Sequence, residues 1–366
     1  MIRPALAELR PYEPGRPIEL VRRELGIEGP IIKLASNEFW EGPLPQAADA
    51  AISAIREVHR YPDGGCLELR DAIAAKHGVA ATRVVVGNGA DGVLNYLAQA
   101  LLDPGDEVAY CWPSFPVYLL NAMKMGAVAR TAPLAGSSYD LEALLSVVGP
   151  RTKMVFITNP NNPTGGMVAA DQLLAFLDAL PPEVLPVVDQ AYFEFVDDPN
   201  FSDAVALARA GRPLVALRTF AKVFGLAGLR VGYGIMPEEV AVACSKTKGA
   251  FDVSHVAQAA ALACLTDDAD VEVLRRASLV RRHRAVVEVG LRSLGLSPWT
   301  SVANFVFVPV GDGVDVAKRL ERRGVIVRPT AGFGAPDAIR VTVGSAEENE
   351  RFLAELGAVL AERGTV

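Results

Sequence analysis

Cysteine and histidine are scarce in this sequence, and neither is clustered. The 366 residues include four cysteines and four histidines. The cysteines are scattered without CxxC spacing, and the histidines do not fall into a ligand pattern with them. Neither a disulfide framework nor a structural zinc site is indicated, so we expect no bound metal.

Long apolar runs and an excess of positive charge are also missing. No run is long enough to span a bilayer, and the N-terminal MIRPALAELRPYEPG lacks the apolar core of a signal peptide. The formal net charge of -7 argues against a nucleic-acid or anionic-membrane partner. We expect a cytoplasmic protein that binds any anionic substrate through a local arginine cluster inside a cleft.

The composition is that of a globular chain, with 51% hydrophobic and 22% charged residues. The length is enough for one large core and a smaller one, which predicts two domains. Short β-branched runs alternate with Ala/Leu-rich segments, which predicts an α/β layer with a mostly parallel sheet and helices on both faces. The expected strands span 84–86, 107–110, 154–158, 185–189, 214–218 and 231–236. The expected helices between them include 93–102, 117–125 and 171–180.

The C-terminal part has a different pattern, which predicts a smaller second unit. A long helix is expected over 268–294, followed by strands over 304–308, 325–328 and 339–343. Ser345 and Glu348 form a capping-box pattern that opens a last amphipathic helix. We divide the chain into an N-terminal arm with part of the small domain (1–46), a large cofactor-binding domain (47–265) and a small C-terminal domain (266–366).

The segment RTFAKVFGLAGLR places Lys222 among small and apolar residues, with Arg230 after it. Partial desolvation disfavours the ammonium form, so an amine able to attack an aldehyde becomes accessible. A lysine of this kind is typical of pyridoxal phosphate (PLP) enzymes, and Arg230 could clamp the cofactor's phosphate. Taken alone, the segment also fits a surface lysine beside a flexible glycine loop.

Other expected strand ends carry suitable groups, and ligands of open α/β sheets bind there. The turn GNGADG runs into a helix and predicts a phosphate cradle made by the backbone of Gly89, Ala90 and Asp91. Phe115 could stack on a pyridine ring, and Asn162 in NPNNPTGG could donate to a ring hydroxyl. Each pattern alone also fits a plain turn or a core residue.

Asp189 ends the apolar run LPVVD, and Tyr192 follows it closely. A carboxylate paired with the pyridine nitrogen keeps that nitrogen protonated, as an electron sink requires. Tyr192 would donate to the ring's phenolate oxygen. The alternative is an aspartate that only caps a turn. It would require the lysine, asparagine, tyrosine and glycine-turn motifs to occur together by chance, so the combination with Lys222 indicates PLP.

With these motifs, nearly the whole chain resembles the fold-type I PLP-dependent aminotransferases, and most closely the histidinol-phosphate aminotransferase group. The resemblance rests on RPYEPGRPIELVRRELG, KLASNE, RYPDGG, GNGADG, NPNNPTG, RTFAK with GLR, and RPTAGFG with IRVTVG. It implies an α/β fold with a mostly parallel central sheet, helices on both faces and a smaller α+β C-terminal domain.

The resemblance also implies roles for individual residues. The implied catalytic residues are Lys222 as the Schiff-base lysine, Asp189 and Tyr192. The implied cofactor contacts add Gly89, Ala90, Asp91, Phe115, Asn162, Thr219 and Arg230, with Tyr61 supplied by the other subunit of a homodimer. The implied substrate contacts are Tyr12, Asn37, Arg328 and Arg340.

The chain departs from the family pattern at several positions. Ala221 stands where a phosphate-contacting serine is common, and Gly92 stands where a glutamate is usual. Gln190 replaces the glutamate that usually follows the aspartate at the strand end. Phe39 and Trp40 replace Asn-Pro near the expected substrate entrance. A more aromatic entrance would suit an aromatic amino acid.

The expected function is ping-pong transamination between histidinol phosphate and 2-oxoglutarate in histidine biosynthesis. The alternative within the fold is an aromatic, especially phenylalanine, aminotransferase. A PLP decarboxylase of the threonine-phosphate type would use the same scaffold. A PLP-sensing regulatory module would need an attached DNA-binding segment and a basic patch, and the sequence has neither.

Overall fold

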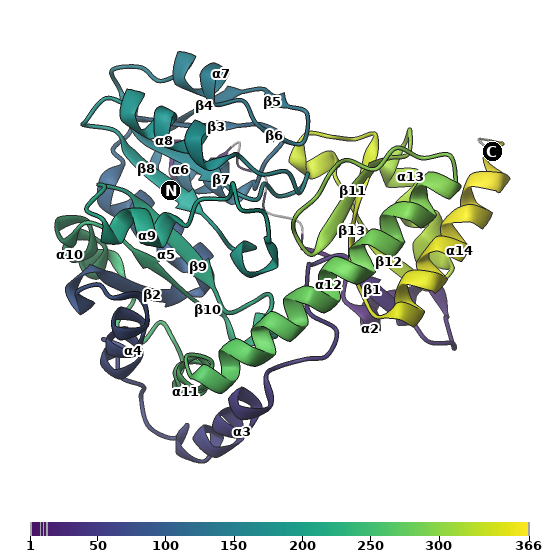
Figure 1. Cartoon of the computed structure of the whole chain (residues 1–366), viewed down its shortest axis with the longest axis horizontal. Coiled ribbons are helices and arrows are strands. Elements are labelled where there is room, and N and C mark those ends of the chain that lie inside the picture. The colour runs from purple at the N-terminus through teal and green to yellow at the C-terminus, as the bar shows by residue number, and fades with distance from the viewer. Residues whose placement is uncertain (1, 8, 10, 12–13, 365–366) are drawn as a thin grey trace.

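The structure is a computed structural model that describes residues 2–364 except 8, 10, 12 and 13. Its larger sheet has seven strands in the order β2-β10-β9-β8-β7-β3-β4 (Figure 1). Their bounds are β2 Val84–Asn88, β3 Glu107–Cys111, β4 Val128–Ala132, β7 Thr152–Thr158, β8 Leu185–Asp189, β9 Val215–Thr219 and β10 Val231–Ile235. Only β10 runs antiparallel to its two neighbours. The expected mostly parallel α/β sheet is therefore confirmed.

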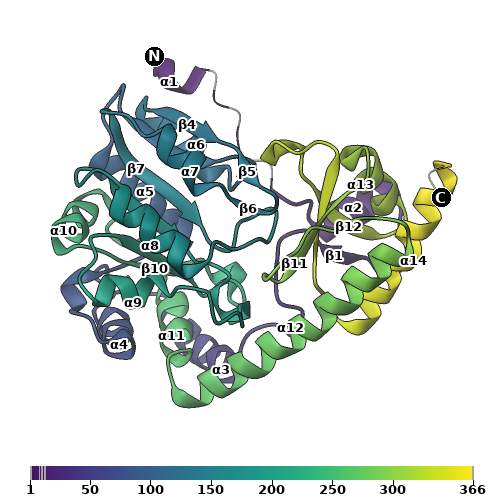
Figure 2. The ribbon, with the colours of Figure 1, turned by 45° about the horizontal axis from the view of Figure 1, so that its top comes forward.

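The middle strands of this sheet are covered on both faces. Every residue of β3, β9 and β10 is buried, including Glu107 of β3 and Arg218 of β9. Figure 2 shows α8 (Ala170–Ala179) in front of the sheet and α5 (Gly89–Leu101) behind it. The remaining helices around it are α3 Pro45–Ala54, α4 Leu67–His77, α6 Val117–Met125, α7 Leu141–Ser146, α9 Ala204–Arg209, α10 Glu238–Thr247 and α11 His255–Ala263.

The smaller sheet has the order β1-β12-β13-β11. Its strands are β1 Ile32–Leu34, β11 Phe305–Pro309, β12 Val325–Pro329 and β13 Ala338–Thr342. It packs with α13 (Gly313–Arg322), α14 (Ala346–Glu362) and part of α12 (Asp267–Ser293), the long helix that runs from one sheet to the other in Figure 1. The capping box is present, because Ser345 Oγ accepts from the Glu348 amide and Glu348 Oε2 accepts from the Ser345 amide.

Three strand features were not expected from the sequence. They are β4 at one edge of the large sheet, β1 in the small sheet, and the short hairpin of β5 (Leu134–Ala135) and β6 (Ser138–Tyr139). Short helices also form at α1 Pro4–Ala7 and α2 Ile18–Leu25. The proposed domain limits at 46 and 265 stay a prediction.

Within the described residues, no helix is both long and apolar enough to cross a membrane. The same residues contain no group of three or more His, Cys, Asp or Glu side chains that could hold a metal ion.

Candidate active site

A cavity of about 420 Å³ lies where the strand ends of the large sheet face the small sheet. Twelve residues with expected site roles line it: Asn37, Ala90, Asp91, Phe115, Asn162, Asp189, Tyr192, Thr219, Lys222, Arg230, Arg328 and Arg340. The parallel strands β7, β8 and β9 end at this edge, and α5 begins there. The fold thus brings these twelve residues, which are far apart in the sequence, around a single cavity.

The N-terminus of α5 forms one end of the cavity. The N-cap residue Asn88 makes no side-chain cap bond, so the helix start is open to a ligand. Gly89 has a φ of +72°, and a Cβ there would lie 2.6 Å from Arg230 Nη2. Arg230 itself has a left-handed φ of +57°, and its carbonyl accepts from the Gly89 amide at 3.0 Å. The start of α5 and the guanidinium of Arg230 therefore lie side by side, an arrangement that suits a bound phosphate group.

Thr219 and Ala221 continue this end of the cavity from β9. The Ala221 amide donates to Thr219 Oγ1 at 3.1 Å, so the hydroxyl of Thr219 can point its hydrogen toward a ligand oxygen. Ala221 lines the cavity but has no hydroxyl. Its departure from the family pattern therefore removes one donor from the phosphate end.

Asp189 is a buried carboxylate at the end of β8. Tyr118 donates its hydroxyl to Oδ2 at 2.8 Å, and the Ala191 amide donates to Oδ1 at 3.1 Å. Burial raises the pKa of Asp189 to about 6 despite these bonds. A cation beside this carboxylate would reverse that shift, so the site fits a protonated ring nitrogen. Sequence reasoning missed Tyr118, although it lies one helical turn beyond Phe115 on α6.

Lys222 lies just beyond β9 and lines the cavity. Its Nζ donates to the Ser36 carbonyl at 3.2 Å and lies 5.6 Å from the ring centre of Tyr192. Burial, followed by the charge of Arg340, lowers the pKa of Lys222 to about 8. The neutral amine needed for attack on an aldehyde is therefore much more accessible than in an exposed lysine.

The amides of Asn37 and Asn162 are oriented by their partners. Asn37 Nδ2 donates to the Tyr192 hydroxyl at 2.9 Å. Arg340 Nη1 donates to Asn162 Oδ1 at 2.6 Å, while its Nη2 donates to the Ala35 carbonyl at 2.6 Å. Because Oδ1 of Asn162 faces Arg340, its Nδ2 is the group that can donate to a ring oxygen.

Two arginines form the opposite end of the cavity. Arg328 on β12 and Arg340 on β13 are direct cross-strand partners. Their exposed fractions are 8% and 4%, and both guanidinium groups lie over the ring of Phe333, at 5.3 and 5.5 Å. This arrangement holds two positive charges in one buried place, which suits a substrate group of high negative charge.

The predicted cofactor contact Tyr61 does not line this cavity. Tyr61 is 82% exposed and stacks on Phe251 with 4.5 Å between ring centres. A cross-subunit role would require a second chain, so it stays a prediction. Tyr12 lies outside the described residues. Gly89 is not in the lining but shapes it through Arg230.

The expected place of Phe39 and Trp40 near the substrate entrance of this cavity stays a prediction. Neither residue contributes to its lining. Trp40 stacks on His283 with 5.2 Å between ring centres, and the Arg276 guanidinium lies 4.5 Å from the ring centre of Phe39. The side chains of α12 therefore hold both aromatics against the long helix.

The other departures have structural roles. Gln190 Nε2 donates to the Ser202 carbonyl at 2.7 Å, and its Oε1 accepts from the Ala204 amide at 3.0 Å. Gln190 thus fastens the loop after β8 to the start of α9. A Cβ at Gly92 would lie 3.2 Å from the Tyr96 hydroxyl, which bonds to Asp252. A side chain at Gly92 would require the Tyr96 hydroxyl to shift by a few tenths of an ångström.

Sequence reasoning missed several lining residues, including Gly15, Ser36, Asn95, Asn121 and Lys124. A signal for the last two was present, since Val117, Leu120, Asn121 and Lys124 have the spacing of one helix face and all line the cavity.

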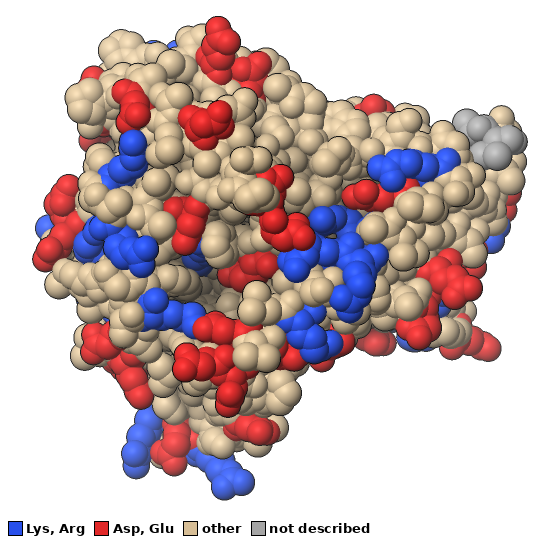
Figure 3. All heavy atoms as spheres, viewed as in Figure 1, with Lys and Arg blue, Asp and Glu red and all other residues tan. Residues whose placement is uncertain are grey.

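Basic side chains of α12 also lie on the outer surface of the molecule. Figure 3 shows basic side chains grouped over the middle of this helix, with acidic side chains gathered toward its start. Arg275 pairs with Glu41 and Glu272, and Arg281 pairs with Asp197 at 3.0 Å. Arg275 and Arg281 are therefore ion-paired, whereas Arg276 of the same helix is buried.

Comparison with known proteins agrees with this geometry. Residues 29–356 match the family Aminotransferase class I and II. A histidinol-phosphate aminotransferase of Anaeromyxobacter sp. (strain Fw109-5) is 45% identical over 98% of this chain and 99% of its own length. The crystal structure of histidinol-phosphate aminotransferase from Sinorhizobium meliloti, in complex with pyridoxal-5'-phosphate, has a TM-score of 0.88 at 27% identity and covers 99% of this chain and 98% of that one. Aspartate aminotransferase from Thermus thermophilus with maleate has a TM-score of 0.86 at 25% identity, covering 98% and 100%. The chain therefore belongs to the class I and II aminotransferase family.

Proposed function

We propose that this protein is a PLP-dependent aminotransferase that transfers the amino group of histidinol phosphate to 2-oxoglutarate. The observation that carries the substrate assignment is the buried pair Arg328 and Arg340 at the end of the cavity that also holds Lys222. The 45% identity to a histidinol-phosphate aminotransferase supports the same assignment. A cytoplasmic location stays a prediction.

The residues of the cavity fit PLP at each of its functional groups. The open start of α5, Thr219 and Arg230 would hold the phosphate, and Phe115 would cover one face of the ring. Asp189 would pair with the ring nitrogen, while Tyr192 and Asn162 would donate to the ring oxygen. When bound, PLP supplies an electron sink for the charge that develops at the reacting carbon of the substrate.

Lys222 is the residue that would carry the cofactor covalently and then move the proton. Its lowered pKa, about 8, keeps an amine available near neutral pH. After the amino donor displaces it, Nζ is the base that takes the proton from the reacting carbon. The same nitrogen would then return the proton to the cofactor carbon on the other side of the amino nitrogen, after which water would have to release the oxo product.

The Arg328–Arg340 end would bind the acid groups of both substrates in turn. A phosphate needs more positive charge than a single α-carboxylate, and the net charge of the chain is -7, so this charge has to be local. Arg340 alone would serve any amino acid. The second guanidinium favours the phosphate of histidinol phosphate and the distal carboxylate of 2-oxoglutarate.

The experiment that tests this assignment is a comparison of kcat/KM for histidinol phosphate, phenylalanine and tyrosine with 2-oxoglutarate as acceptor. The expected result is a clear preference for histidinol phosphate. A preference for phenylalanine would replace the assignment with an aromatic aminotransferase. Release of CO₂ from a phosphorylated amino acid in place of amino transfer would favour the decarboxylase alternative.

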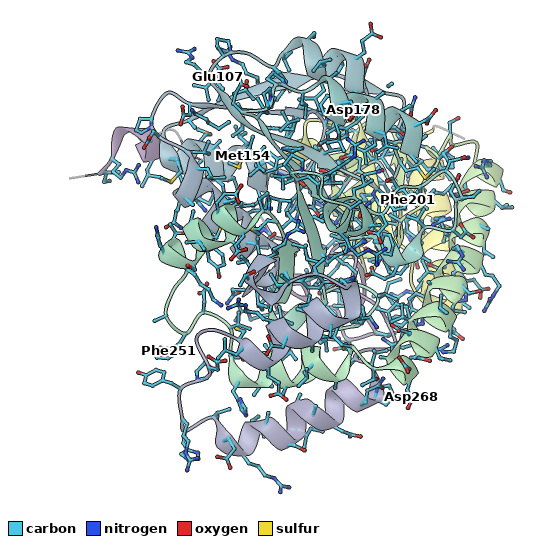
Figure 4. All side chains as sticks on the ribbon, turned by 60° about the vertical axis from the view of Figure 1, so that its left-hand side comes forward. Glu107, Met154, Asp178, Phe201, Phe251 and Asp268 are labelled. Carbon is cyan, nitrogen blue, oxygen red and sulfur yellow. The ribbon has the colours of Figure 1, made fainter. Side chains whose placement is uncertain are left out.

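We also propose a homodimer in which Tyr61 reaches the cofactor phosphate of the partner subunit. Apolar side chains that are more than half exposed gather in the segments around Tyr61: Ile52, Ile55, Val58, Leu67 and Phe251. Figure 4 shows Phe251 projecting from the edge of the molecule. A surface of this kind is typical of a contact between chains.

Mixing two inactive or weakened variants tests the shared site. A Tyr61→Phe chain keeps Lys222, and a Lys222→Ala chain keeps Tyr61, so a mixed dimer would hold one intact site. Activity should therefore rise above the sum of the two separate proteins after subunit exchange. A fully active monomer in sedimentation at assay concentration would contradict the proposal.

A further inference from the structure

Four buried hydroxyl groups form a cluster beside Asp189. They belong to Ser114, Tyr118, Tyr139 and Thr158, and none of these residues is more than 4% exposed. The hydroxyl oxygens of Tyr118 and Thr158 lie 2.8 Å apart, as do those of Ser114 and Tyr139. Thr158 Oγ1 also lies 3.2 Å from the oxygens of Ser114 and Tyr139. Because a buried hydroxyl is costly unless it is bonded, the acceptors within reach determine where each hydrogen points.

The amide of Asn161 sets the direction of the bonds at one end of this hydroxyl cluster. Its Nδ2 donates to the Pro113 carbonyl at 3.1 Å and to Thr164 Oγ1 at 2.7 Å. Its Oδ1 is therefore an acceptor, and Ser114 Oγ donates to it at 3.0 Å. The single hydrogen of Ser114 is used in this bond, so the Ser114 oxygen can only accept from the rest of the cluster.

The carboxylate of Asp189 sets the direction at the other end. An ionised carboxylate only accepts, so Tyr118 uses its hydrogen in the 2.8 Å bond to Asp189 Oδ2. The Tyr118 oxygen is then free to accept the hydrogen of Thr158. Tyr139 completes the cluster by donating to Ser114. The bonds from Thr158 to Tyr118 to Asp189 thus run in one direction, and such a chain polarises its last donor and strengthens the bond to the carboxylate.

This last bond acts on the charge of Asp189. Burial raises the pKa of Asp189 to about 6, and the bond from Tyr118 is the largest of the effects that oppose burial. The pyridine nitrogen proposed to face this carboxylate would compete with it for one proton. A hydrogen bond to the ionised carboxyl favours the arrangement with the proton on the nitrogen. If the proton moved to Asp189, the ring would become neutral and would be a weaker electron sink.

We propose that Tyr118 and Thr158 are positioning residues that keep the shared proton on the ring nitrogen of the cofactor and off Asp189. This inference rests on the proposed use of PLP, with Asp189 at the ring nitrogen. It gives the buried hydroxyl cluster a role in the reaction that is exerted through the carboxylate. A merely structural role of the two side chains would leave the place of this proton unchanged.

The test uses PLP labelled with nitrogen-15 in the ring, because the NMR chemical shift of this nitrogen reports whether it is protonated. In the wild type loaded with this PLP, without substrate, the shift should be that of a protonated ring. Tyr118→Phe should move the proton equilibrium toward Asp189 by about tenfold, as for the loss of one hydrogen bond to a charged group. The chemical shift should then move toward the unprotonated value. Thr158→Val keeps the branched shape and should move it the same way by less.

Tyr110→Phe is the matched control. Tyr110 is 1% exposed, and its ring centre lies 5.8 Å from that of Tyr118. The Asp189 oxygens accept from Tyr118 and from the Ala191 amide, so loss of the Tyr110 hydroxyl should leave the chemical shift unchanged. Denaturant unfolding checks that each variant is folded, and Thr158→Val decides the question if Tyr118→Phe does not fold.

A double-mutant cycle shows whether the effect passes through Asp189. In an Asp189→Asn background the amide cannot take the proton, so Tyr118→Phe should cause no further change in the ring nitrogen. A wild-type chemical shift in folded Tyr118→Phe and Thr158→Val, an equal change in Tyr110→Phe, or a change that persists in the Asp189→Asn background would overturn the inference. Failure of the wild type to bind PLP would instead overturn the proposed function.

Discussion

The two ends of the cavity are built in different ways. The cofactor end comes from neighbouring parallel strands and the start of α5, so Asp189, Thr219 and Arg230 each follow or end a strand of one sheet. The acid-binding end combines β12 and β13 with the segment after β1, and Arg340 connects it to the large sheet through its bond to Asn162. The first end is a property of the large sheet, and the second depends on how the small sheet is placed.

This difference predicts different consequences of substitution. A change at the cofactor end should affect every substrate alike, because it alters the chemistry common to all of them. A change at the acid-binding end should affect substrates according to their charge. Arg340 links the two ends, since it bonds to Asn162 and its charge also lowers the pKa of Lys222.

The largest effect is expected for Lys222→Ala. Removal of the amine proposed to carry the cofactor and move the proton should lower kcat by at least about 10⁴-fold for all amino donors. Steady-state rates with histidinol phosphate and phenylalanine provide the measurement. Borohydride reduction of the wild type followed by peptide mapping is the companion experiment, and modification of another lysine would contradict the assignment.

The next largest effect is expected for Asp189→Asn. The neutral amide cannot hold a proton on the ring nitrogen, so the proton-transfer step should slow by about 10²- to 10³-fold. Cofactor content should stay close to that of wild type, because the phosphate cradle is unchanged. Single-turnover kinetics together with absorbance of the bound cofactor separate the two effects. A variant that transaminates at nearly the parent rate would rule out this role.

The same division explains what the sequence could predict. The strands 185–189 and 231–236 stand out as apolar runs, and Asp189 and Lys222 lie at strand ends where an α/β sheet binds ligands. The edge strand β4 was missed because its exposed residues break the apolar pattern, and β1 because it has only three residues and pairs with a strand far along the chain.

Packing against residues far away in the sequence determines where Phe39 and Trp40 lie. Their sequence neighbours place them near the substrate entrance, but Arg276 and His283, far away in the sequence, hold them on α12. Arg328 and Arg340 fall on two expected strands of the small unit, and the structure pairs them directly. Their role in substrate binding stays a prediction.

Arg328→Met should discriminate between substrates. The expected loss in kcat/KM for histidinol phosphate corresponds to about 1.5–3 kcal/mol, the range for a charge-assisted contact, while phenylalanine should lose much less. Arg328→Lys keeps the charge but lacks the planar fork, so it should fall between wild type and Arg328→Met. Equal losses for both substrates would mean that Arg328 supports the small sheet and does not recognise phosphate.

The smallest effect expected is a displaced pH profile. The neutral form of Lys222 is the one that reacts with the cofactor's aldehyde, and its pKa is lowered to about 8, first by burial and then by Arg340. The rate of PLP uptake by the cofactor-free chain should therefore rise with pH up to about 8 and level off above it.

Arg340→Met removes a charge that lowers this pKa, so the profile should move to higher pH. Asp91→Asn removes a charge that raises it, so the profile should move to lower pH. Each displacement should be less than about one pH unit, since two charges separated by solvent-filled space interact weakly. Stopped-flow absorbance across pH 6 to 10 measures all three profiles, and a shift of both variants in the same direction would show that these charges do not set the pKa of Lys222.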